Sequence, residues 1–302
     1  MSTFVTAEGA SSSPEIATGI LARVVRIVRR MPGAFIGAFV VLLYIGMGAA
    51  SFVVDPNQSS LAQRLIPPLG LGGSSAHWLG TDSLGRDVAA RVMAGARVSL
   101  AIGALTVTLA ALLGTCLGLL AGWRTNWIDS LLSRSADFLL AFPMLIFAIG
   151  VMTVAGSGFW VIVLALGFQL WVEFYRLVRG EVLAQRNLDY VDAARAMGRS
   201  SHAILLDEIL PNIVHSVIVV ATVRIGYVII MEASLSFLGL GIQPPTPTWG
   251  SMIADGRGLM LTAWWLATIP GVAILGLVMG LNLLGEGLRQ ALDPRHGRSF
   301  DA

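Results

Sequence analysis

The ionisable side chains of this chain are few and widely separated. His77, Asp82, Arg86 and Asp87 lie within one polar stretch, and Arg224 lies in a run, 213–231, that is apolar apart from it and His215. A metal site would need further ligands beside His77, and the stretch offers no second histidine. The chain contains no lysine, so it has no phosphate-binding loop ending in Gly-Lys-Ser or Gly-Lys-Thr. We therefore expect no catalytic site, no bound metal or cofactor, and no ATP hydrolysis by this chain itself.

The most informative segment lies between residues 192 and 212. It reads Asp192-Ala193-Ala194-Arg195-Ala196-Met197-Gly198, then nine residues, then Glu208-Ile209-Leu210-Pro211-Asn212. Alanines favour a helix and allow close approach, Gly198 permits a turn after it, and Pro211 is tolerated where the next helix begins. Such a short helix suits docking to a partner that transmits a rigid-body push. The alternative is a solvated surface helix.

Membrane spans must position these residues. The 302 residues are 55% hydrophobic and only 13% charged, with a mean hydropathy of +0.76, which is outside the range of ordinary soluble domains. The net charge of +2 does not indicate nucleic-acid binding. Runs of membrane length predict six spanning helices, at 34–54, 98–123, 138–155, 159–172, 213–231 and 258–285. The predicted fold class is an all-α integral membrane protein with a single domain in the lipid bilayer.

The placement of arginine predicts the orientation. All 20 basic residues are arginine, and cytoplasmic segments hold more of them than outer loops if the N-terminus is cytoplasmic. We therefore expect a cytoplasmic segment at 1–33, a membrane domain at 34–285 and a cytoplasmic tail at 286–302. Within the domain we expect outer loops at 55–97 and 232–257 and a cytoplasmic loop at 174–212. Arginines at helical spacing make 1–33 either an orientation anchor or a helix along the membrane surface.

Three segments carry a resemblance to a known family. Residues 192–211 match the pattern Glu-Ala-Ala, three residues, Gly, nine residues, Ile, one residue, Leu-Pro, with Asp192 in place of Glu and Glu208 in place of Ile. This is similar to the coupling loop of ABC importer permeases. The run from His77 to Leu100 resembles the segment before the second span in peptide-type permeases, and the run from 232 to 250 resembles the segment before their last span. The chain thus resembles the second, C-type permease subunit of the oligopeptide/dipeptide/nickel family, with a type I importer transmembrane domain.

The resemblance implies a function, partners and sites. A member would be the non-catalytic permease of an ATP-driven, binding-protein-dependent importer in the bacterial cytoplasmic (inner) membrane. It would act with a second permease, two cytoplasmic ATPase domains that hold ATP and Mg, and an extracytoplasmic solute-binding protein. The ATPase-coupling residues would be Asp192, Ala193, Ala194, Ala196, Met197, Gly198, Leu210 and Pro211. The binding-protein side would be His77, Gly80, Thr81, Asp82, Gly85, Arg86 and Asp87, and the gate or pathway would include Arg224, Glu232, Phe237, Gly239 and Gly241.

Several alternatives stay open at this point. Di- and oligopeptides are the favoured cargo, but nickel chelates, haem, glutathione or oligosaccharides fit the same architecture. An ion-coupled secondary transporter would carry carboxylates within its spans, and the uncharged runs contain none. A structural scaffold would not need the docking loop. Arg224 either faces a solute pathway or pairs with a carboxylate inside the protein or on the partner permease.

Two loop segments also allow specific expectations. Ala233 to Gly241 is too apolar for a free loop and too rich in glycine for a stable helix, so we expect a re-entrant or interfacial turn there. Asp82 or Asp87 is expected to pair with Arg86 or Arg91 and so order the outer loop, the alternative being loop packing alone.

Overall fold

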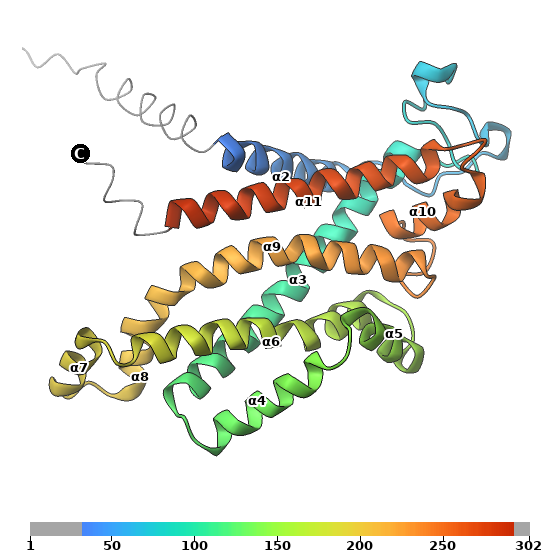
Figure 1. Cartoon of the computed structure of the whole chain (residues 1–302). Coiled ribbons are helices and arrows are strands. Elements are labelled where there is room, and N and C mark those ends of the chain that lie inside the picture. Colours follow the sequence, from blue (N-terminus) through green and yellow to red (C-terminus); the bar gives the residue numbers. More distant parts are fainter. Residues whose placement is uncertain (1–31, 293–302) are drawn as a thin grey trace, which may run out of the picture.

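Within residues 32–292, which the structure describes, every regular element is a helix (Figure 1). The structure is a computed structural model. The long helices are α2 (Pro32–Ala50), α3 (Val88–Trp123), α4 (Trp127–Leu140), α5 (Met144–Ala155), α6 (Phe159–Gln185), α9 (Leu210–Phe237) and α11 (Trp265–Leu292). The short ones are α7 (Asp189–Ala196), α8 (Ser201–Ala203) and α10 (Trp249–Gly256).

Five of these helices are long and apolar enough to cross a membrane: α2, α3, α6, α9 with the helical turns before it, and α11. The pair α4 and α5 passes the same test together but is bent by 88° at its break. Counting that pair as one crossing gives six spans. The prediction of an all-α membrane fold with six spans is therefore confirmed, with one span broken.

The break between α4 and α5 follows from Pro143. Proline has no N–H to donate and disfavours helical backbone at the residue before it, so α4 ends at Leu140 and α5 begins at Met144. The predicted start of this span at 138 is wrong, because the helix begins at Trp127.

The two acidic residues of α4 have charged partners on α6. Arg179 on α6 donates to both carboxylate oxygens of Asp129, at 2.6 and 2.8 Å, and Arg176 donates to Asp137. These ion pairs explain why an uncharged run is a poor guide to the start of the helix.

Other helices also extend beyond the runs that predicted them. α3 begins at Val88 instead of 98, α6 continues past 172 to Gln185, and α9 continues past 231 to Phe237. α11 is shifted instead: it begins at Trp265, later than the predicted 258, and continues past 285 to Leu292. The loops predicted at 55–97, 174–212 and 232–257 are therefore partly helical, because hydropathy marks only the apolar middle of a helix. The predicted basic segment at 1–33 and the tail from 286 fall largely outside the described residues.

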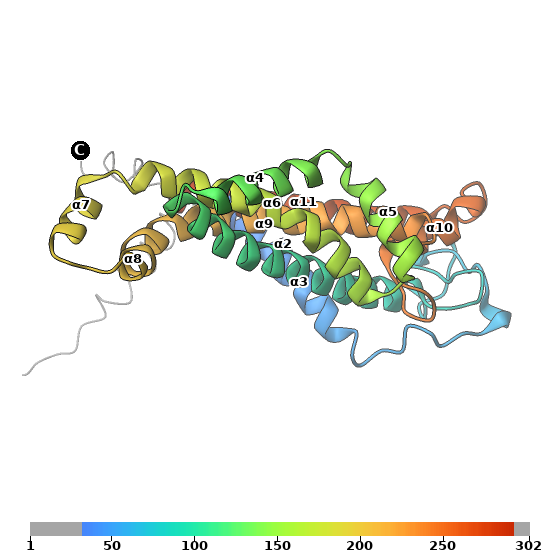
Figure 2. The ribbon, with the colours of Figure 1, turned by 90° about the horizontal axis from the view of Figure 1, so that it is seen from below.

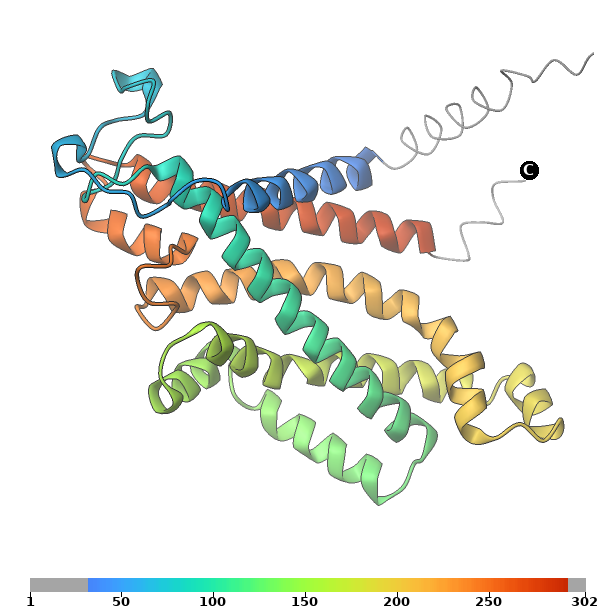
Figure 3. The same cartoon turned by 180° about the vertical axis from the view of Figure 1, so that it is seen from behind.

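Glycines let α3 and α6 pack with their backbones close together. Gly114, Gly118 and Gly122 lie four residues apart on α3, and a Cβ at these positions would lie 2.5, 2.8 and 2.7 Å from atoms of α6. Small residues at this spacing are a common device for close helix contact in membranes. Figure 3 shows α3 crossing diagonally over α9 and α6.

The two ends of the bundle carry different elements. α7 and α8 project from one of them, and α10 lies at the other beside the chain between α2 and α3 (Figure 2). We call these the α7 end and the α10 end. α2 lies along α11, where Gly37 leaves so little room that a Cβ would lie 2.5 Å from the amide nitrogen of Leu284.

Candidate functional site

The predicted docking helix forms as α7 and is ended by Gly198. Asp189 and Asp192 in its first turn and Arg195 in its last complement the helix dipole. Gly198 has a φ of +79°, its amide donates to the carbonyl of Arg195 at 2.9 Å, and the next amide donates to the carbonyl of Ala194 at 3.1 Å. This is a Schellman motif, which strongly favours glycine at that position. The predicted turn at Gly198 is thus confirmed.

The faces of α7 divide the predicted coupling residues into two groups. Val191 and Ala194 are buried against the chain's own core. Ala194, one of the predicted coupling-loop residues, therefore packs inward and does not lie on the exposed face of α7. Exposed residues form the other face: Asp192, Ala193, Ala196, Met197 and Gly198. Of the remaining predicted residues, Leu210 is half-buried and Pro211 is exposed at the start of α9.

Specific contacts at this end join α7 to α3, and α3 to the segment just after α6. The guanidinium of Arg195 lies 4.9 Å from the ring centroid of Trp123, and it also donates to Asp192 at 2.8 Å. Arg186, just after α6, donates to the carbonyl of Gly122 at 3.1 Å. The sequence analysis missed Trp123 and Arg186, since their partners lie more than 60 residues away.

The return from α7 into α9 depends on Arg199. Its guanidinium forks between two carboxylates, those of Asp207 and Glu208. Both belong to a π-helical turn, Ile204–Ile209, that precedes α9. Glu208, the one departure in the second half of the motif, thus has a charged partner within the loop.

At the α10 end, Asp82 organises the loop before α3. One of its carboxylate oxygens accepts the amides of Leu84 and Arg86 at 2.8 and 2.9 Å, and the other accepts the side chain of Arg86 at 2.7 Å. Arg91 lies 3.7 Å from the same carboxylate. The predicted pairing of Asp82 with Arg86 is therefore confirmed.

The other predicted loop residues have structural partners as well. His77 contacts Asp87 and Gln63, both at 3.2 Å, and Asp87 accepts the amide of Ala90 at 2.9 Å, which caps α3. Thr81 accepts the amide of Ile66 at 2.9 Å, and Gly80 and Gly85 have φ values of +80° and +73°. No group of three His, Cys, Asp or Glu side chains among residues 32–292 is arranged to hold a metal ion.

Arg224 pairs with a carboxylate of its own chain. Its guanidinium contacts Glu173 on α6, and the side chains of both residues are 34% exposed. The ring of Tyr227 lies 5.4 Å from the same guanidinium. The structure therefore provides the partner within the chain that the ion-pair interpretation of Arg224 requires. Glu173 is the first residue after the uncharged run that ends at 172, so it lies just outside the predicted span and was not considered as a partner.

The segment from Ala233 to Gly241 is helical in its first half, so the predicted re-entrant or interfacial turn is limited to its second half. α9 continues to Phe237 because Glu232, fully buried, accepts Ser236 at 2.7 Å one turn later and Ser99 of α3 at 3.3 Å. The glycines come only after the helix. Gly239 ends it with a φ of +81°, and Gly241 packs directly against Ser236.

Tryptophan fixes α10 against the start of α3. Trp249 is fully buried and donates from its ring nitrogen to the carbonyl of Val92 at 3.0 Å. Gly95 makes room for this ring, because a Cβ there would lie 2.7 Å from it. The α10 end is thus a tightly packed unit of α3, α9 and α10.

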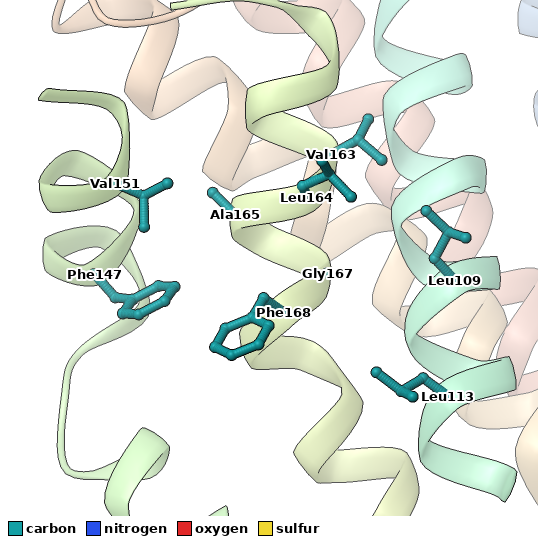
Figure 4. Close-up of a pocket in the computed structure, with 9 residues that line it drawn as sticks. All are labelled: Leu109, Leu113, Phe147, Val151, Val163, Leu164, Ala165, Gly167 and Phe168. Atoms are coloured by element: carbon teal, nitrogen blue, oxygen red, sulfur yellow. The ribbon is translucent and has the colours of Figure 1, made fainter. Parts of the chain in front are cut away.

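A groove of about 560 Å³ lies between α3, α5 and α6 (Figure 4). Its lining is entirely apolar: Leu109, Leu113, Phe147, Val151, Val163, Leu164, Ala165, Gly167 and Phe168. Polar groups are what fix the orientation of a polar ligand, so this surface is suited to apolar neighbours in the membrane.

Comparison with known proteins connects these features to a family. Residues 114–298 match the family described as "Binding-protein-dependent transport system inner membrane component". A glutathione transport system permease protein GsiD of Pectobacterium atrosepticum is 48% identical over 224 residues, 74% of each chain. That of Escherichia coli is 44% identical over 263 residues, 83% of this chain and 87% of the relative.

The fold is also that of a solved ABC transporter structure. It is an inward-facing conformation of the MetNI methionine ABC transporter, which matches 67% of this chain and 96% of its own with a TM-score of 0.56 at 16% identity.

Proposed function

Because the chain belongs to the family of binding-protein-dependent transport system inner membrane components and is a multi-pass ABC importer permease, we propose that its cargo is a small peptide, with glutathione the first to test. Two relatives at 48% and 44% identity bear the name of glutathione transport permeases, which supports this choice. Glutathione is itself a tripeptide and falls within the proposed class. Nickel chelates, haem and oligosaccharides are the competing cargoes.

We infer that the chain works with three kinds of partner. A second permease completes the solute pathway, ATPase subunits holding ATP and Mg contact α7, and a solute-binding protein meets the α10 end. The α7 end and both termini then lie in the cytoplasm, in agreement with the arginine distribution. The observation that carries the coupling role is the exposed strip of Asp192, Ala193, Ala196 and Met197 on α7. This helix contacts α3 through Arg195 and Trp123, and its Tyr190 donates to Gln185 at the end of α6 at 2.8 Å.

These contacts suggest how movement of the ATPases would reach the membrane. A push on α7 passes to α3 through Arg195 and Trp123 and to α6 through the short connection that carries Arg186. α3 and α6 are closely packed through glycines, so they move together as a rigid body. The solute pathway then alternates between its two sides without chemistry in this chain.

The test uses the complete importer reconstituted in liposomes with its binding protein. ATPase activity and uptake are measured with glutathione, di- to octapeptides, nickel chelates, haem and oligosaccharides. We expect stimulation by glutathione or short peptides only. Stimulation by another class alone would retain the importer and overturn the peptide proposal.

The coupling role is tested in the same system with Ala193→Trp, which adds a large ring to the exposed face of α7. We expect an assembled complex in which substrate no longer stimulates ATP hydrolysis. Thr125→Trp is the matched control, since Thr125 is exposed in the α3–α4 connection at the same end. Normal coupling in Ala193→Trp would contradict the role given to α7.

A further inference from the structure

A polar hollow of about 460 Å³ opens at the α10 end. Three segments border it: the start of α3 with the loop before it, the turn after α9, and α10. Its charged lining residues are Arg86, Arg91 and Asp255, and Gln243 and Ser251 add polar groups. The polar lining distinguishes this hollow from the apolar groove of Figure 4. The volume of the hollow lies in the range of small-molecule sites.

Arg91 is the least satisfied group in this hollow. The residue is 4% exposed, and its Nη1 atom has no hydrogen-bond partner among residues 32–292. Its nearest carboxylates, on Asp82 and Asp255, are 3.7 and 3.9 Å away, which is beyond hydrogen-bond length. A buried guanidinium without acceptors is costly, so an additional oxygen ligand would stabilise it. Arg86, by contrast, is held by Asp82 at 2.7 Å.

Asp255 places the opposite charge beside Arg91. Its side chain is 61% exposed, and one of its oxygens lies 3.9 Å from the guanidinium of Arg91. A second hollow of only about 10 Å³, too small for a solute, also adjoins both residues. The hollow therefore presents neighbouring charges of both signs, which complements a molecule that also carries both.

We propose that this hollow is a subsite for a zwitterionic, peptide-like solute, whose carboxylate contacts Arg91 and whose ammonium group contacts Asp255. The inference rests on the proposed importer function and adds a contact between this subunit and its cargo at the α10 end. A carboxylate at the part of the Arg91 guanidinium that lines the hollow would add an acceptor, and charge-assisted hydrogen bonds of this kind are stronger than neutral ones.

The experiment measures equilibrium binding of radiolabelled Ala-Ala to the co-purified membrane complex in nanodiscs, without binding protein. N-acetyl-Ala-Ala and Ala-Ala amide, each lacking one terminal charge, are the matched ligands. We expect either modification to weaken binding to the wild type roughly tenfold. Asp255→Asn should weaken Ala-Ala by a similar factor and leave N-acetyl-Ala-Ala unchanged. Asp55→Asn, another exposed acid outside the hollow, is the control and should bind like the wild type.

Arg91→Lys provides the second arm and should weaken Ala-Ala while leaving Ala-Ala amide unchanged. Should that buried substitution prevent assembly, Asp255→Asn still decides, because its side chain is exposed. Equal binding of all ligands by wild type and Asp255→Asn would overturn the subsite. The subsite would also be overturned if these variants bound peptide normally but no longer bound the ligand-free binding protein, since the hollow would then serve that protein. Failure of the importer itself appears separately, as absence of peptide uptake by the wild type.

Discussion

The guanidinium of Arg195 on α7 lies 4.9 Å from the ring centroid of Trp123, the last residue of α3. This contact joins the helix that we assign to coupling with the longest helix of the bundle. Trp123→Ala should therefore lower substrate-stimulated ATPase activity, about two- to fivefold if the contact contributes about 0.5 to 1 kcal/mol. Trp127→Ala is the control, since Trp127 is exposed four residues later. Equal activity of the two variants would exclude a coupling role for Trp123.

Arg199 should stabilise the entry into α9. Arg199→Ala leaves Asp207 and Glu208 as adjacent like charges, and we expect a loss of about 0.5 to 1 kcal/mol because all three side chains are a third or more exposed. The melting temperature in detergent should fall by about 1 to 3 °C. The swap Arg199→Glu with Glu208→Arg should recover part of that loss, and a double-mutant cycle with no interaction energy would refute the pairing.

The close contact of α3 with α6 should not tolerate a larger residue. Gly114→Leu places a side chain where a Cβ alone would lie 2.5 Å from the carbonyl oxygen of Trp171, so we expect a loss of about 3 kcal/mol or failure to fold. Gly150→Leu on α5 is the control, because no atom lies within 4 Å of its added Cβ. The measurement is the yield of monodisperse protein on size exclusion together with thermal stability.

Because Arg224 and Glu173 form an ion pair, we expect removal of one partner to destabilise the protein more than removal of both. Arg224→Leu or Glu173→Leu alone leaves a partly buried charge without its partner, whereas the double variant leaves none. We expect both single variants to unfold at lower temperature and the double variant to recover most of the difference. A double variant that folds normally but transports a different set of solutes would instead favour a pathway role for Arg224.

Hydropathy predicts the spans of this chain well, because crossing a bilayer imposes length and composition on each helix separately. Gly198 was also predictable, since its role depends on local backbone geometry. The ring of Trp249 reaches the carbonyl of Val92 across 157 residues, and Arg224 finds Glu173 on another helix. Contacts of this kind depend on which helices become neighbours, and no local pattern specifies that.

The inward orientation of Ala194 illustrates the same limit within one short helix. The motif correctly identified a helix ended by glycine, but a pattern of small residues does not say which of them faces a partner. Only the packing of Val191 and Ala194 against the core separates the inner face from the exposed one.

The bent pair of helices around Pro143 decides whether the number of membrane crossings is odd or even. Trp123 and Arg186 both lie close to α7, so α3 and α6 end on the same side of the bundle. Both helices therefore run in the same direction, and the chain has to return between them. The two halves of 14 and 12 residues, α4 and α5, make that return. At a rise of about 1.5 Å per residue each half alone is shorter than the hydrocarbon core of about 30 Å. A reporter fused within residues 156–158 should thus lie across the membrane from one fused within 124–126, and with six crossings residues 32 and 292 are expected on the side that carries α7.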